Sequence, residues 1–169
     1  MPSPLKLRRA SEADARLVAD IHILSRATTY RDQLPDHYLE VVMPLETCTF
    51  WPQRMTDIAA SDGIVFIAEN QEGPIGFICV EYPDANFSAN IDNLHVLPAN
   101  KGQGAGSLLL AQAQSWARTK GARQLHLQVL DSNEAAIRFY ESKGWQFSVE
   151  QSARIGDSAV IMLRYEFLF

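Results

Sequence analysis

The sequence is poor in cysteine and has no long apolar run. Its 169 residues include only Cys48 and Cys79, too few for a disulfide framework, so a reducing compartment is expected. No apolar run approaches the ~18–20 residues that a membrane-spanning helix needs. Residues 1–6 lack the apolar region of a signal peptide. These features predict a cytoplasmic protein with a single domain over residues 1–169 and no membrane partner.

An excess of basic charge is also lacking. The chain has 15 Lys and Arg against 20 Asp and Glu, a formal net charge of −5. Because non-specific nucleic-acid binding needs a basic face, no nucleic-acid partner is expected. Mild acidity suits a cationic partner such as an amine, but it also serves solubility alone. The four histidines show no metal-ligand spacing, which predicts that no metal is bound.

The first half of the chain shows helical and then strand patterning. Ser11-Glu12-Ala13-Asp14 forms a capping box before apolar residues that recur at helical spacing from Leu17 to Leu24. Further helical stretches are expected over residues 36–42 and 50–60. Residues 63–69 and 74–82 predict two strands, and the turn at residues 70–73 between them predicts a hairpin.

The next strand changes its alternation. Its apolar residues occupy positions 87, 89 and 91, and then positions 94 and 96. Since a strand alternates strictly, this shift predicts an extra residue near Asp92 and Asn93, which is a β-bulge. A strand break with a short turn is the alternative. A bulge would splay two neighbouring strands and free backbone donors.

The second half alternates strands and helices. A polar connection over residues 98–106 precedes an amphipathic helix over 107–120, a strand over 123–130 and a helix over 133–143. Two more strands are expected, at residues 145–149 and 159–167. This order predicts an α/β fold with a mixed sheet.

A glycine-rich segment leaves a strand and opens the first of those helices. In Lys101-Gly102-Gln103-Gly104-Ala105-Gly106-Ser107, the glycines let backbone N–H groups approach a ligand, and the helix N-terminus adds partial positive charge. That arrangement fits a pyrophosphate, and a tight turn without a ligand is the alternative. A P-loop is excluded because its Gly-Lys-Ser/Thr ending is absent, and the third glycine of a dinucleotide fingerprint is missing.

Three segments in order resemble one known family. They are Asn93-Leu94-His95-Val96-Leu97-Pro98, Lys101-x-x-Gly104-x-Gly106, and the Asn-x-x-Ala-x-x-x-Tyr-x-x-x-Gly-Trp pattern over residues 133–145. Together they resemble the GNAT superfamily of acetyl-CoA-dependent N-acetyltransferases, with Lys101 where Arg or Gln is usual. The resemblance implies an α/β fold with a mixed, mostly antiparallel central sheet, a β-bulge splay and flanking helices. It says almost nothing about the acceptor.

The resemblance also implies which residues bind acetyl-CoA. The glycine-rich loop would hold the pyrophosphate, and the backbone of Leu94 and Val96 would pair with the pantetheine arm. The implied cofactor-binding residues are Leu94, His95, Val96, Lys101, Gly102, Gln103, Gly104, Ala105, Gly106, Ser107, Asn133 and Tyr140.

Tyr140 and Asp92 are the implied catalytic residues. A phenol can protonate the leaving thiolate, so Tyr140 is expected to act as the general acid; its alternative role is a core tyrosine. Many relatives carry Glu where this chain has Asn90, which leaves Asp92 at the bulge as the nearest carboxylate to act as the base. Glu81 and His95 are alternative bases, and Asp92 could instead bond its own backbone.

The expected reaction is direct attack of an amine on acetyl-CoA in a ternary complex. The acceptor could be a small amine, an amino acid, an aminoglycoside or a protein N-terminus. Tyr30, Arg31 and the segment to Tyr38 would shape the acceptor pocket or form a surface loop. A non-catalytic acyl-CoA-binding module and transfer of a longer acyl group are the alternatives. A homodimer using residues 159–167 is also compatible with the sequence.

Overall fold

The computed structural model describes residues 3–169 and is built around one seven-stranded sheet. Its strands lie in the order β1-β2-β3-β4-β5-β7-β6, and only β4 and β5 pair in parallel. The sheet is therefore mixed and mostly antiparallel, as predicted. The strands are β1 Lys6–Arg9, β2 Ile64–Asn70, β3 Gly73–Val80, β4 Ser88–Val96, β5 Gln124–Leu130, β6 Gln146–Ile155 and β7 Ser158–Leu168.

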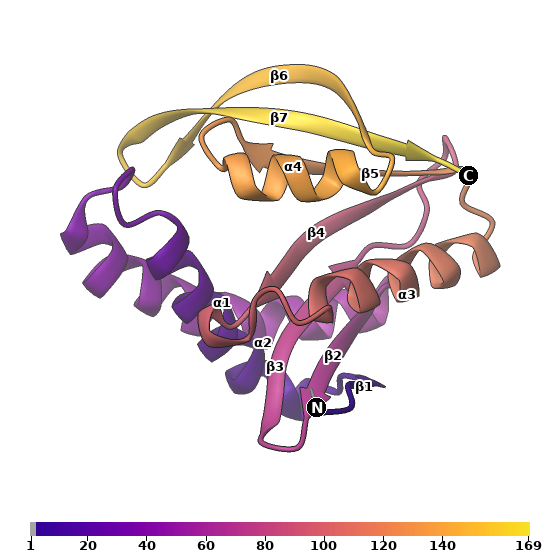
Figure 1. Cartoon of the computed structure of the whole chain (residues 1–169), viewed down its shortest axis with the longest axis horizontal. Coiled ribbons are helices and arrows are strands. Elements are labelled where there is room, and N and C mark those ends of the chain that lie inside the picture. Colours follow the sequence, from indigo (N-terminus) through magenta and orange to yellow (C-terminus); the bar gives the residue numbers. More distant parts are fainter. Residues whose placement is uncertain (1–2) are drawn as a thin grey trace.

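Four α-helices cover the two faces of this sheet (Figure 1). They are α1 Ala15–Thr29, α2 Met43–Ala60, α3 Ala105–Thr119 and α4 Glu134–Ser142. One core cluster joins α1 and α2 to β2 and β3, and a second joins α3 and α4 to the opposite side of the sheet. Since β2 and β3 are covered on both faces, they are continuously apolar rather than alternating.

The predicted hairpin and bulge are both confirmed. The Asn70 side-chain oxygen accepts hydrogen bonds from the backbone N–H of Glu72 and Gly73, at 2.8 and 3.2 Å, and so closes the β2–β3 turn. Between β3 and β4, Cys79 pairs with Asn93 but Val80 pairs with Ile91. Asp92 is therefore the extra residue of the bulge.

The helical segments before β2 differ from the prediction. Residues 36–42 and 50–60 are joined into one continuous helical stretch, in which the π-helical turn Tyr38–Val42 leads directly into α2. Pro44 and Pro52 lie within this stretch although proline lacks an N–H to donate within a helix. The wider π turn immediately before Pro44, in which Met43 N–H donates to the Tyr38 carbonyl, accommodates one of these prolines.

Two smaller differences lie in the strands and in α3. The short strand β1 pairs with β2 and was not expected, because its four residues are mostly basic. Helix α3 begins at Ala105 rather than at residue 107. None of the described helices is long and apolar enough to cross a membrane.

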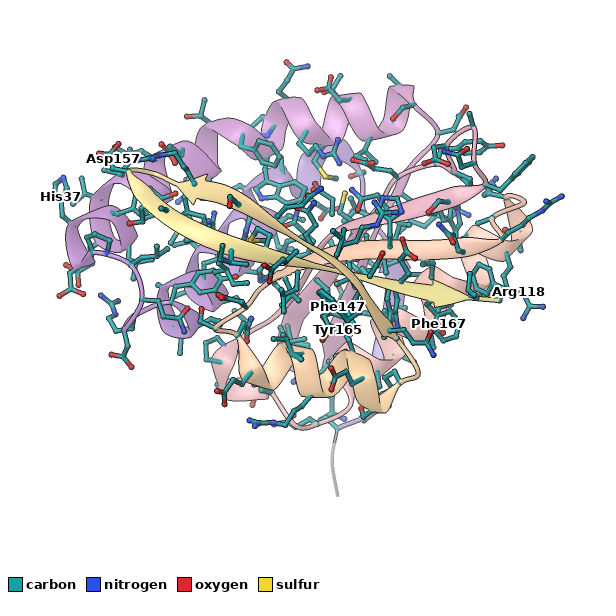
Figure 2. The ribbon with its side chains drawn as sticks, turned by 90° about the horizontal axis from the view of Figure 1, so that it is seen from above. His37, Arg118, Phe147, Asp157, Tyr165 and Phe167 are labelled. Atoms are coloured by element: carbon teal, nitrogen blue, oxygen red, sulfur yellow. The ribbon has the colours of Figure 1, made fainter. Side chains whose placement is uncertain are left out.

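The β6–β7 hairpin extends over the α1–α2 end of the molecule. Figure 2 shows its turn, marked by Asp157, beside the segment that carries His37. Ile155, at the end of β6, packs on a small core cluster of Leu34, Leu39 and Met43, against which Tyr30 and Tyr38 also pack. The hairpin therefore holds the α1–α2 connection against the rest of the fold.

Candidate active site

The central feature of the site is a split in the sheet. β4 and β5 pair only through Ser88–Ile91 and Gln124–Leu127, and beyond this point β4 keeps only β3 as its neighbour while β5 keeps β7. Figure 1 shows the two halves of the sheet diverging from there. A cavity of about 950 Å³ lies at the split, lined by both strands, the start of α3, α4, and parts of α1 and α2.

The edge of β4 is open toward this cavity. The Leu97 N–H donates to the Ile75 carbonyl at 2.7 Å, which places Leu97 in a hydrogen-bonded pair with β3. Such pairs alternate along an antiparallel ladder, so His95 also bonds to β3, whereas the backbone groups of Leu94 and Val96 point away from it. These N–H and C=O groups therefore face the split, where β5 has moved away.

The glycine-rich loop places free amides at a second wall of the cavity. Gly104 has φ +92° and caps α3, and the Leu108 N–H donates to the Gly104 carbonyl at 3.0 Å. The amides of residues 104–107 consequently have no partner within the helix and form an anion-binding helix start. Lys101 also lines the cavity, whereas the side chain of Gln103 turns back to the Ala99 carbonyl, at 3.5 Å, and is not among the lining residues.

Tyr140 contributes to the α4 wall. Its ring packs edge-on against Phe139, with 5.3 Å between ring centroids, and lines the cavity. Burial, with a smaller effect of nearby Tyr30, raises the pKa of Tyr140 above the ordinary tyrosine range. The phenol therefore remains protonated at neutral pH. Asn133 also lines the cavity, and its side-chain oxygen accepts the Ala136 N–H at 3.3 Å to cap α4.

The carboxylates near the bulge share one arginine. Arg54 Nη2 contacts Asp92 Oδ2 at 3.0 Å and Glu81 Oε1 at 2.8 Å. The Asn93 side chain donates to the same Asp92 oxygen at 3.1 Å, so both contacts use Oδ2 rather than Oδ1. Asp92 lines the cavity, but Glu81 and Arg54 do not.

A polar face of α1 forms a further wall of the cavity and was not predicted from the sequence. His22, Ser25, Arg26 and Thr29 line the cavity at the spacing i, i+3, i+4 and i+7, and His22 and Ser25 are buried. This spacing is visible in the sequence beside the apolar face, and it could have identified α1 as part of the site.

His22 and His95 stack at the centre of this wall, with 4.4 Å between their ring centroids. The buried Trp51 indole N–H donates to His22 Nδ1 at 2.9 Å, so His22 carries its proton on Nε2. Ser25 Oγ and His95 Nδ1 are hydrogen-bonded at 3.0 Å. Burial, then the charge of Arg26, lowers the pKa of His95 to about 3, and mainly burial lowers that of His22 to about 2. Both imidazoles are therefore neutral at physiological pH.

Metal ligation finds no support in the side chains. Within residues 3–169, no group of three or more His, Cys, Asp or Glu side chains is placed to hold a metal ion. Both cysteines are free thiols, and neither lines the cavity. The site instead combines free backbone donors, one buried phenol, the carboxylates of Asp92 and Glu46, and two neutral imidazoles.

Comparison with known proteins identifies the family. The pattern of the acetyltransferase (GNAT) family matches residues 26–145. Streptothricin acetyltransferase of Streptomyces lavendulae is 34% identical over 94 residues, which cover 55% of this chain and 50% of that protein. An uncharacterized N-acetyltransferase of Bacillus subtilis, YuaI, is 26% identical over 140 residues, or 80% of this chain and 77% of that protein. The chain thus spans half the length of the first of these relatives.

A solved structure shares the fold over nearly the whole chain. The PaiA N-acetyltransferase from Thermoplasma acidophilum, crystallised in complex with coenzyme A, is 20% identical and covers 98% of this chain and 99% of its own, with a TM-score of 0.78. The predicted fold is confirmed by this likeness and by the split sheet. With the pattern matched across residues 26–145, the chain belongs to the acetyltransferase (GNAT) family.

Proposed function

We propose that this protein transfers the acetyl group of acetyl-CoA to an amine, by direct attack in a ternary complex. One observation carries the proposal: the open edge of β4 at Leu94 and Val96, the free amides at the start of α3 and the Tyr140 side chain all line one cavity. Direct attack is favoured because neither Cys48 nor Cys79 lines that cavity, and burial raises the pKa of the Cys79 thiol to about 12.

The residues present fit acetyl-CoA as the acetyl donor. The amides of residues 104–107 would bind the pyrophosphate together with the positive charge of Lys101. An extended chain containing amides, such as pantetheine, can pair with the open backbone of Leu94 and Val96 as an added strand would. The loop has room for this ligand, because a Cβ placed on Gly102 or Gly104 would meet no heavy atom within 4 Å.

The chemistry then needs three groups from this chain. The Val96 N–H, which points away from β3, would donate to the oxyanion that develops on the thioester carbonyl. The Tyr140 phenol, held neutral by burial, would protonate the leaving thiolate. Asp92 would accept the proton of the attacking amine at Oδ1, directly or through water, since its contacts with Arg54 and Asn93 use Oδ2.

The test measures thiol release from acetyl-CoA across a panel of amines, amino acids, aminoglycosides, N-terminal peptides and streptothricin, the last suggested by the name of one relative. Tyr140→Phe should lower kcat by about 100-fold and leave the affinity for acetyl-CoA within a few fold, because it removes the proton but keeps the buried ring. Acetyl-CoA binding without thiol release from any acceptor would favour the non-catalytic module, which Asn90 at the usual glutamate position also supports. Thiol release from longer acyl-CoA esters would instead favour transfer of an acyl group longer than acetyl.

We also propose a domain organisation, a cellular location and an oligomeric state for this protein. The chain acts as one domain over residues 1–169, of which residues 1 and 2 lie outside the described part. It works in the cytoplasm, as its two free thiols suggest. It forms a homodimer through the outer strand β6, which exposes Phe147 and Val149, rather than through the edge of residues 159–167, because β7 is paired on both sides with β5 and β6.

A further inference from the structure

Two opposite charges face the cavity from α1 and α2. Arg26 and Glu46 both line it, and both lie on the α1–α2 wall rather than beside the glycine-rich loop. The hydroxyl of Tyr38 donates to Glu46 Oε2 at 3.4 Å, and Tyr38 lies near enough to Arg26 for that charge to act on the pKa of its phenol, which burial mainly raises. Tyr38 and Ile155 both pack against the core cluster of Leu34, Leu39 and Met43.

The fold leaves both charges without an ionic partner in the described residues. Among residues 3–169, neither Arg26 nor Glu46 takes part in an ion pair, although Arg54, Arg31 and Arg8 are all paired with carboxylates. The guanidinium of Arg26 lies over the ring of Tyr30, 5.9 Å from its centroid, and is half-buried. A half-buried arginine without an anion, in a cavity, is placed to bind one.

The other charged side chains of the cavity, those of Lys101 and Asp92, already have a role or a partner. Lys101 belongs to the loop that would hold the pyrophosphate, and Asp92 is paired with Arg54 at the bulge. Arg26 and Glu46 therefore remain for the second substrate. Their positive and negative charges, on the same wall of the cavity, are complementary to a carboxylate and an ammonium of one ligand.

The geometry points to an acceptor with a zwitterionic α-amino-acid head, whose carboxylate binds Arg26, whose α-ammonium binds Glu46, and whose second amine reaches the Asp92–His95 wall to be acetylated. This assignment rests on the proposed function and narrows its acceptor to basic amino acids such as lysine or ornithine. Arg26 and Glu46 are specificity residues in this scheme and take no part in proton transfer.

The experiment compares three acceptors that differ by one charged group. L-Lysine carries both groups, cadaverine lacks the carboxylate, and 6-aminohexanoate lacks the α-amine; ornithine, putrescine and 5-aminopentanoate form a shorter series. Wild-type protein should acetylate the amino acid of one series with a kcat/KM about 10- to 100-fold above either analogue, the size expected for one hydrogen-bonded charge.

Substitution of Arg26 or Glu46 should weaken recognition only of the acceptors that carry the matching charged group. Arg26→Gln should lower kcat/KM for the amino acid and the aminocarboxylate by about 10- to 100-fold but leave the diamine unchanged, and Glu46→Gln should spare the aminocarboxylate instead. Arg26→Lys should restore part of the activity. Arg16→Gln, on the exposed side of α1 in a pair with Asp20, is the matched control and should behave as wild type.

The outcomes separate the inference from the function on which it rests. Equal rates for a diamine and its amino acid, or an Arg26→Gln effect equal on all three acceptors, would overturn the inference and leave the acetyltransferase standing. Acetylation only of amines that belong to neither the lysine nor the ornithine series would also overturn the inference and leave the acetyltransferase standing. A selective change in the KM for acetyl-CoA in Arg26→Gln would reassign this arginine to the donor. No thiol release with any amine would refute the proposed function itself.

Discussion

Acid should destabilise this protein through the two buried imidazoles of the site. The pKa values of His22 and His95 are lowered to about 2 and about 3, mainly by burial, against about 6.5 in an unfolded chain. Between these values the unfolded chain binds protons that the folded protein does not, so stability is complete above pH ~6.5 and falls as the pH drops below it. From pH ~7 to ~4.5 each imidazole should cost about 2.5 kcal/mol, or about 5 kcal/mol together. That is comparable to the whole stability of many domains, about 5–15 kcal/mol.

Urea unfolding followed by tryptophan fluorescence at a series of pH values would measure this loss. Below pH ~6 the free energy of unfolding should fall by about 2.7 kcal/mol per pH unit, and by roughly half as much in His95→Gln, because glutamine does not titrate. His37→Gln is the control, since His37 is exposed at the end of the molecule beside the β6–β7 turn (Figure 2). Burial also lowers the pKa of His126, which adds to the wild-type slope in the same direction. A slope unchanged in His95→Gln would refute the reasoning.

Two further predictions concern the bulge and its neighbour strand. Gly76→Ala should lower the free energy of unfolding by about 1–3 kcal/mol, because its Cβ would lie 2.8 Å from the carbonyl oxygen of His95. Gly106→Ala, whose Cβ would meet nothing closer than 3.6 Å, is the control in the same urea titration, and equal effects would contradict the packing argument. Asp92→Asn should lower kcat by about 100-fold in the thiol-release assay, since an amide cannot accept the proton. Glu81→Gln should change kcat far less, and the reverse order would make Glu81 the base.

Short-range sequence patterns were enough to predict those parts of the site that are formed by backbone groups. The parity change around Asp92 gave the bulge, and the density of glycine from Gly102 to Gly106 gave the helix start. Both are consequences of short-range geometry, in which a period of two or a positive φ leaves a direct trace in the residue types. The resemblance to the family followed from the segments around these two features together with the pattern over residues 133–145.

Contacts between side chains that are far apart in the sequence could not be predicted in this way. Arg54 reaches Asp92 from a helix 38 positions earlier, and Trp51 reaches His22 from 29 positions away, so no local spacing connects these pairs. Pro52 lies inside α2 although proline lacks the N–H of a helical hydrogen bond, and the adjacent Trp51 is fully buried; tertiary packing of this kind can override helix propensity. Which residues face the acceptor depends on such packing.

The position of β7 also constrains the order in which the protein can assemble during translation. β7 is made after β6, yet it lies between β5 and β6 and pairs with both. While the ribosome is still adding residues 158–168, β6 has no partner and β5 can pair only with four residues of β4. The half of the sheet that carries α4 and Tyr140 therefore cannot close before residues 158–168 have been made.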